Sequence, residues 1–125
     1  MEEAIRILVV DDEPDIRRIC RILLETGGYT VLEAATGAEA VEQVRQHPEL
    51  DLILMDIMMP VMDGYEAARR IRKLADPVHA NKPIIAMTAY AFEEDVKAAL
   101  AAGMNEHLSK PIRIELLYEI MKKYL

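Results

Sequence analysis

Short apolar runs alternate five times with longer segments of helical periodicity, and this alternation constrains the fold more than any other feature of the chain. We predict strands over residues 5–10, 30–34, 52–56, 83–88 and 106–108, and helices over residues 14–25, 37–46, 64–74, 92–102 and 112–124. Capping-box spacing at Thr36 with Glu39, and at Asp63 with Glu66, supports two of the helix starts. Alternating strands and helices imply an α/β fold, in which helices cover both faces of a parallel sheet.

The composition of the runs predicts the strand order. The first, third and fourth runs are almost entirely apolar, as expected of strands that are covered on both faces. The second run carries Glu33 and the fifth carries Glu106 and His107, so these two suit the edges. The second run also ends without a reactive side chain, which places it farthest from a functional site. These features favour a flavodoxin-like, doubly wound five-stranded sheet with the order 2-1-3-4-5 and five helices.

Reactive side chains stand at the ends of the other four runs. Asp11 and Asp12 follow the first run, Asp56 ends the third, Thr88 ends the fourth and Lys110 follows the fifth. In an open α/β sheet the carboxyl ends of the strands form the binding crevice. Clustered carboxylates repel each other unless a hard cation neutralises them, and Mg²⁺ prefers oxygen ligands. Because a lysine and a hydroxyl suit phosphoryl oxygens, the sequence predicts a Mg²⁺-dependent phosphoryl site.

Each of these residues has a simpler structural interpretation when it is taken alone. The acids at 11–13 would suit the start of helix 14–25, where negative charge is favourable by about 0.3–1 kcal/mol. Thr88 would be an ordinary strand-end residue, and Lys110 a surface charge. Asp56 is harder to explain in this way, because apolar residues flank it and an unpaired carboxylate there is costly. The convergence of all these groups on one sheet edge favours the functional interpretation.

Charge and composition exclude several classes of function. The formal net charge of −7 argues against a nucleic-acid-binding surface. No apolar run approaches the roughly 20 residues that cross a membrane, and the N-terminus lacks the features of a signal peptide. We therefore expect a cytoplasmic protein with one domain over residues 1–125 and no contact with nucleic acid or membrane. Cys20, the single cysteine, is interpreted as a small core hydrophobe.

Four stretches carry a resemblance to a known family: LVVDDE, LILMDIMMPVMDGYE, PIIAMTA and GMNEHLSKPI. Over essentially its whole length the chain resembles the receiver domain of two-component response regulators, of the chemotaxis-regulator type. The resemblance implies that a sensor histidine kinase or a histidine phosphotransfer protein transfers a phosphoryl group to Asp56. Such a protein is a signalling phosphoacceptor rather than an enzyme.

The resemblance also implies roles for the neighbouring residues. Asp12 would bind Mg²⁺ directly and Asp11 largely through water, while Asp56 and the main-chain carbonyl of Met58 would complete the metal site. Thr88 and Lys110 would hold the phosphoryl oxygens, and Pro111 would follow a cis peptide bond. The family docks its histidine donor around helix 14–25, whose charged face of Arg17, Arg18 and Arg21 is either donor-facing or simply solvated.

In the family, phosphorylation moves Thr88 and rotates the residue at position 107, which alters the face formed by residues 92–102, 106–108 and 112–124. Position 107 is a histidine here rather than the commoner tyrosine or phenylalanine, so an edge-strand histidine without a switch role stays an alternative. Met58 and Tyr90 flank the expected path of an attacking water and would not orient it, which predicts a long-lived phosphoaspartate.

Helix 112–124 has a wider apolar arc than one sheet face requires, and the arc includes Ile114, Tyr118 and Met121. We expect this surplus to form a second contact, with a second copy of the chain or with an output protein.

Three alternatives to a stand-alone receiver domain can be compared with the residues of this chain. An aspartate-nucleophile phosphatase would normally carry a second acid where this chain has Ile57 and Met58. A flavin or nucleotide module would need a GxGxxG or GxxxxGK loop, which the sequence lacks. A receiver domain of a hybrid histidine kinase also matches GMNEHLSKPI, although a stand-alone regulator is favoured.

Overall fold

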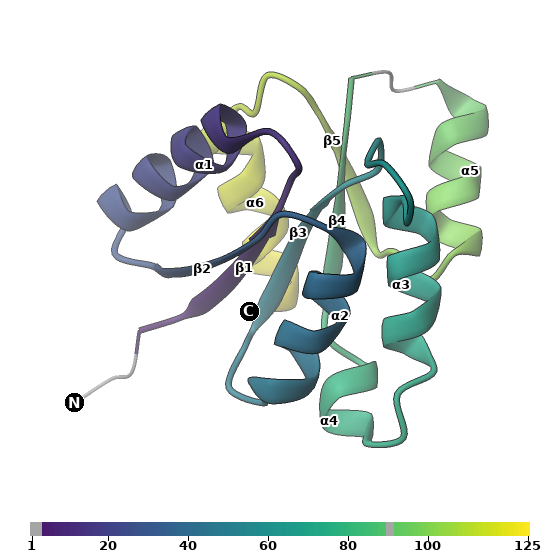
Figure 1. Cartoon of the computed structure of the whole chain (residues 1–125). Helices are drawn as coiled ribbons and strands as arrows, with labels where there is room; N and C mark the ends of the chain where they lie inside the picture. Colours follow the sequence, from purple (N-terminus) through teal and green to yellow (C-terminus); the bar gives the residue numbers. More distant parts are fainter. Residues whose placement is uncertain (1–3, 90–91) are drawn as a thin grey trace.

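The computed structural model describes residues 4–89 and 92–125, which form a parallel sheet covered by helices (Figure 1). The strands are β1 (Arg6–Val10), β2 (Thr30–Ala34), β3 (Leu52–Asp56), β4 (Ile84–Thr88) and β5 (Glu106–Ser109). The helices are α1 (Pro14–Thr26), α2 (Gly37–Gln46), α3 (Gly64–Arg72), α4 (Pro77–Ala80), α5 (Glu93–Ala101) and α6 (Ile114–Tyr124). Within these described ranges, no helix is long and apolar enough to cross a bilayer.

The strands pair in parallel in the order β2-β1-β3-β4-β5, which confirms the predicted topology. Val10 at the end of β1 pairs with Ala34 of β2 and with Met55 of β3. Thr88 at the end of β4 pairs with Ser109 of β5. The carboxyl ends of the five strands therefore finish at one edge of the sheet, and the residues that follow them are held close together.

Two apolar layers attach the helices to the sheet. On one face, α1 and α6 contribute Cys20, Leu24, Leu117 and Met121 to the core, and α2, α3 and α5 cover the other face (Figure 1). All residues of β3 and β4 are buried, as expected of strands with helices on both sides. Burial raises the pKa of the Cys20 thiol to about 11, which agrees with its predicted role as a core hydrophobe.

The short helix α4 was not predicted, and it gives the described part of the chain six helices where five were expected. Helix α3 ends at Arg72, two residues before the predicted boundary. Asp76 then begins α4, because its side chain accepts the N–H of Val78 and Pro77 occupies the first turn. A helix of four residues is too short to show an apolar period, so the sequence pattern does not reveal it.

Helix α6 uses most of its apolar arc inside the molecule. Met121 is 2% exposed, and Ile114 packs against the same core. Tyr118 lies against Tyr29, with their ring centroids 5.9 Å apart. Met121 is therefore not available for the expected second contact. Ile114 and Tyr118 are only partly buried, so the expectation that they contribute to such a contact stays a prediction. Leu116 of α6 does face solvent, at 41% exposed.

Candidate functional site

Three carboxylates meet at the edge where β1 and β3 end. Asp11 and Asp12 follow β1, and Asp56 is the last residue of β3. One oxygen from each lies within 4.8 Å of the others, so the predicted cluster is present. Asp11 is fully buried and Asp56 is 1% exposed, whereas Asp12 is exposed to solvent. The site therefore has two buried acids and a third acid at its rim.

Lys110 brings a positive charge to these carboxylates from the end of β5. Its Nζ lies 3.0 Å from Asp11 Oδ2 and 3.1 Å from Asp56 Oδ1. Its main-chain N–H donates to the carbonyl oxygen of Thr88 at 2.8 Å, which attaches the loop to β4. The peptide bond between Lys110 and Pro111 is cis, as the family resemblance implied. The ammonium thus lies between two buried anions that come from different strands.

The charges in this pocket are not balanced. Burial and the negative charge of Asp11 raise the pKa of Asp56 to about 6, although Lys110 and the N–H of Met58 oppose this shift. For Lys110, burial disfavours the ammonium, but its contacts with Asp11 and Asp56 outweigh burial and raise its pKa. One ammonium therefore compensates the acids incompletely, and the pocket favours the binding of a proton or a cation.

The loop between β3 and α3 packs closely against Asp56. The main-chain N–H of Met58 donates to Asp56 Oδ1 at 3.3 Å, while the Met58 side chain is 67% exposed. Gly64 begins α3, and a Cβ at this position would lie 2.4 Å from the carbonyl oxygen of Asp56. The N–H of Gly64 donates to the Ile57 carbonyl at 2.9 Å. A glycine is therefore needed for α3 to begin this near the acid.

Thr88 and His107 occupy different positions relative to the pocket. Thr88 ends β4 and is 5% exposed. Because Asp56 pairs with Met87 in the sheet, Thr88 lies one residue further along the neighbouring strand. His107 lies within β5 and is exposed to solvent. Tyr90 lies outside the described residues.

The donor set fits a hard divalent cation such as Mg²⁺. Carboxylate oxygens are the ligands that this ion prefers. Within the described residues, Asp11 Oδ2 is buried and accepts no well-directed hydrogen bond, although Lys110 Nζ lies 3.0 Å away as an ion-pair partner. A buried carboxylate oxygen whose partner among the described residues is a single ion pair can accept a further positive charge, and a metal ion would supply it.

Sequence reasoning missed a contact that Arg17 makes with the acidic loop. Its guanidinium donates to the main-chain carbonyl oxygen of Asp11 at 2.6 Å and to Glu33 on β2 at 3.2 Å. The arginines of this helix were interpreted as solvated or donor-facing, yet the Arg17 side chain is 17% exposed. The available signal was Glu33, an acid in an otherwise mostly apolar strand.

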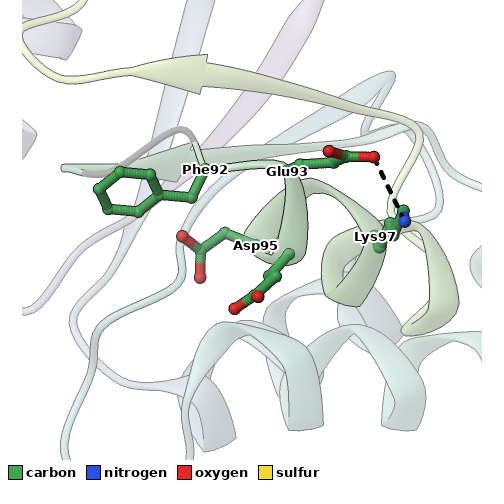
Figure 2. A pocket seen from close by; sticks show the side chains of 5 residues that line it. Phe92, Glu93, Asp95 and Lys97 are labelled. Atoms are coloured by element: carbon green, nitrogen blue, oxygen red, sulfur yellow. Dashed lines mark ion pairs between the residues drawn. The ribbon is translucent and has the colours of Figure 1, made fainter.

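A separate cavity of about 510 Å³ lies at the first turn of α5 (Figure 2). Its lining residues are Phe92, Glu93, Glu94, Asp95 and Lys97. Glu93 pairs with Lys97 at 3.3 Å, and Figure 2 shows Phe92 pointing away from this pair. Acids are favoured at a helix N-terminus in any case. These side chains therefore have an ordinary structural explanation, and the carboxylates of Asp11, Asp12 and Asp56 remain the candidate functional site.

Comparison with known sequences gives one family. The model described as the response regulator receiver domain matches residues 7–122. The chain is 42% identical over 123 residues to the two-component response regulator ORR41 of Oryza sativa subsp. japonica, with 96% of this chain and 94% of that protein covered. It is 40% identical over 121 residues to the signal transduction histidine-protein kinase BarA of Escherichia coli K12. That alignment covers 97% of this chain and 13% of the kinase.

Solved structures agree with the sequence matches. The chemotaxis protein CheY4 of Vibrio cholerae superposes with a TM-score of 0.89 at 30% identity, covering 98% of this chain and 100% of that one. The receiver domain of the Pseudomonas aeruginosa sensor histidine kinase PA1611, which has a magnesium ion in its active-site cleft, gives 0.87 at 36% identity with 98% of each chain covered. The Saccharomyces cerevisiae complex of the histidine phosphotransfer protein Ypd1 with the Ssk1 receiver domain gives a TM-score of 0.84 at 28% identity. This match covers 99% of this chain and 90% of that one.

The imbalance of charge predicts how stability depends on pH without metal. The folded pKa of Asp56, about 6, lies above its ordinary value of 3.8, so the native state binds this proton more tightly than the unfolded state. Asp56→Asn should therefore be more stable than the parent by about 3 kcal/mol at neutral pH in magnesium-free buffer. Well below the ordinary pKa of 3.8 the carboxyl is protonated in both states, and the advantage should vanish. Urea unfolding at several pH values measures this difference.

Asp51→Asn is the matched control, since Asp51 precedes the same strand at its opposite end and accepts the N–H of Arg6 at 2.9 Å. This variant should give no stabilisation that grows with pH. An advantage of Asp56→Asn that is the same at every pH would show that ionisation of Asp56 is not its cause.

Proposed function

The chain belongs to the response regulator receiver domain family of two-component signalling, and on this premise we propose that it accepts a phosphoryl group on the carboxylate of Asp56. The observation that carries the proposal is the position of Asp56, 1% exposed at the end of a buried strand and 3.1 Å from Lys110 Nζ. The donor would be the phosphohistidine of a sensor histidine kinase or of a histidine phosphotransfer protein.

In this reaction Asp56 is the nucleophile. One carboxylate oxygen forms a bond to phosphorus while the bond between phosphorus and the donor imidazole breaks, and the electron pair of that bond stays on the imidazole nitrogen. Lys110 and the hydroxyl of Thr88 donate to the phosphoryl oxygens and stabilise the charge on the group in transfer. The product is an acyl phosphate, and this covalent state is itself the signal.

We propose Mg²⁺ as the cofactor, held by the carboxylates of Asp11, Asp12 and Asp56 and by the main-chain carbonyl of Met58. When bound, Mg²⁺ would neutralise negative charge on the acids and on the phosphoryl oxygens. Two observations support this assignment: the buried Asp11 Oδ2 without a well-directed donor among the described residues, and the raised pKa of Asp56. The similar receiver domain from Pseudomonas aeruginosa holds a magnesium ion in its cleft.

We propose that the donor docks beside α1. Ile19 and Ile22 of this helix are 53% and 56% exposed and offer apolar contacts. In the yeast complex, the partner of the receiver domain is a histidine phosphotransfer protein. Because the relatives include both a response regulator and a histidine kinase of which this chain spans 13%, a receiver within a hybrid histidine kinase is the second candidate.

We further propose that phosphorylation acts through Thr88 and His107 on the face of α5, β5 and α6. A cavity of about 170 Å³ lies between α5 and β5 and is lined by Val96, Ala99, Leu100, Asn105, Glu106 and His107. Leu100 is 56% exposed beside it. An exposed leucine next to a cavity and to the exposed His107 supports contact with a second copy of the chain or with an output protein.

The acceptor assignment predicts the outcome of phosphorylation in vitro. Asp56→Asn should fold but take up no label from a phosphorylated histidine kinase, or from acetyl phosphate with Mg²⁺, because the amide cannot form an acyl phosphate. The parent and the control Asp51→Asn should both gain label that is stable to acid and labile to base. Full labelling of Asp56→Asn would remove this residue as the acceptor.

The metal assignment predicts a stabilisation by Mg²⁺. If the dissociation constant is about 1 mM, about 10 mM Mg²⁺ adds roughly 1.4 kcal/mol to the free energy of unfolding by mass action. Asp12→Ala should lose this response, whereas the control Asp15→Ala, which removes an exposed acid from the first turn of α1, should retain it. Thermal unfolding with and without Mg²⁺ measures both, and a full response in Asp12→Ala would exclude Asp12 from the site.

The proposed output face predicts a change in assembly. Treatment with fluoroberyllate, which mimics the phosphoryl group, should increase the dimer fraction in sedimentation, and Leu100→Glu should reverse the increase. Ile22→Glu is the matched control, because Ile22 and Leu100 are each 56% exposed and Ile22 lies on α1. If the treated protein stays monomeric and no partner protects the face in hydrogen exchange, the face has no such role.

A further inference from the structure

Arg17 of α1 connects two elements that meet beside the acidic loop. Its Nη1 donates to the main-chain carbonyl oxygen of Asp11 at 2.6 Å, and its Nε donates to Glu33 Oε1 at 3.2 Å. Glu33 belongs to β2, which runs next to α1 (Figure 1). The Arg17 guanidinium therefore connects the loop of Asp11 and Asp12 to helix α1 and to strand β2. Neither of these elements contributes an acid to the carboxylate cluster.

Asp11 is constrained through each of its polar groups. Its N–H donates to the Ala34 carbonyl at 3.2 Å, and its Oδ1 accepts the N–H of Glu13 at 2.9 Å. Its Oδ2 lies 3.0 Å from Lys110 Nζ. The carbonyl oxygen is the remaining group, and Arg17 holds it. The bond from Glu13 to Oδ1 closes a turn around Asp12, and the bond from Arg17 acts on the peptide between Asp11 and Asp12 itself.

That peptide determines where Asp12 points. The carbonyl of Asp11 and the amide nitrogen of Asp12 share one rigid plane. A donor that fixes the carbonyl direction therefore also fixes the start of Asp12, and with it the region that the Asp12 carboxylate can reach. Because Asp12 is exposed, surrounding side chains do not hold it by burial, and its aim depends on the main chain.

Glu33 keeps the guanidinium in place. It lies opposite Val9 in the pairing of β1 with β2, and its second carboxylate oxygen pairs with Arg21. The planar fork of an arginine can donate to a carbonyl and to a carboxylate at once, which the point charge of a lysine does less well. Since Arg17 and Glu33 are neutral together, they orient the loop without adding net charge beside the carboxylates.

We propose that Arg17, held by Glu33, is a positioning residue that orients Asp11 and Asp12 for binding of a divalent cation. This inference rests on the Mg²⁺ site of the proposed function, but it concerns residues outside the carboxylate cluster. It also makes β2, which ends without a reactive side chain, part of the machinery of the site.

Arg17→Lys tests the proposal, because lysine keeps the charge but not the fork. We expect the dissociation constant for Mg²⁺, measured by isothermal titration calorimetry, to rise about tenfold, the lower end of the usual effect of losing a residue that orients a metal ligand. Glu33→Gln should shift it in the same direction. Arg21→Lys is the matched control, since Arg21 also pairs with Glu33 but otherwise contacts Glu25 and the Val31 carbonyl. It should keep the parent value.

Amide NMR of the magnesium-free protein separates positioning from a loss of stability. Arg17→Lys should shift the Asp12 and Glu13 resonances while lowering the free energy of unfolding no more than Arg21→Lys does. Parent-like affinity and resonances in Arg17→Lys, or equal weakening in Arg21→Lys, would overturn the inference. A parent protein that binds no Mg²⁺ would instead defeat the proposed cofactor, and the metal-free resonances would still decide the role of Arg17.

Discussion

The site depends on an excess of negative charge that the fold holds in place. Asp11 and Asp56 are buried at the ends of neighbouring strands, and Lys110 lies between them. Charges removed from water interact strongly, and a buried anion that is incompletely paired destabilises the folded state. The two acids cannot separate without breaking the pairing of β1 with β3. The pocket therefore keeps an unsatisfied affinity for positive charge, which is the property that a cation-assisted phosphoryl site requires.

The apolar sheet makes this local cost tolerable. The strands β3 and β4 are buried along their whole length, and each fully buried Leu, Ile or Met side chain contributes about 1.5–3 kcal/mol. Asp56 is the last residue of β3, and Asp11 and Asp12 follow β1, so the middle of β3 and β4 carries no charge. Stability and reactivity are thus separated along each strand, with packing in its middle and chemistry at its carboxyl end.

The separation of packing from chemistry along each strand also explains which features could be predicted from the sequence. Apolar runs and their punctuation depend on local residues, so the strands, their order and the convergence of Asp11, Asp12 and Asp56 could be derived. The roles of Thr88 and Lys110 in holding phosphoryl oxygens stay predictions, although Lys110 does lie in contact with the acids.

The features that could not be predicted are of two kinds. Some depend on contacts between segments that are distant in the sequence, and one is a helix too short to show an apolar period. The helical wheel of α6 does not contain Tyr29, which packs against Tyr118 from the turn that follows α1. The charged face of α1 does not reveal that Arg17 turns inward to Glu33, because this requires the position of β2. The four residues of α4 carry no period at all, and only the Asp76–Pro77 start signal marks them.

The opposite edge of the sheet shows how the geometry of the site is maintained from a distance. Arg72 is partly buried, and desolvation lowers its pKa. Its guanidinium donates to the carbonyls of Ala80, Lys82 and Gly103 and to Asn105 Oδ1. The same Asn105 oxygen accepts the N–H of Ile84 at 2.8 Å, and the Asn105 N–H donates to the Ile84 carbonyl at 2.8 Å. These bonds fix where β5 begins against β4. Fixing the first pair of residues in two neighbouring strands fixes the register of the remaining pairs. The bonds between Asn105 and Ile84 therefore also determine that Ser109 lies opposite Thr88 at the far end of the strands. Lys110 follows Ser109, so these bonds determine where Lys110 enters the pocket.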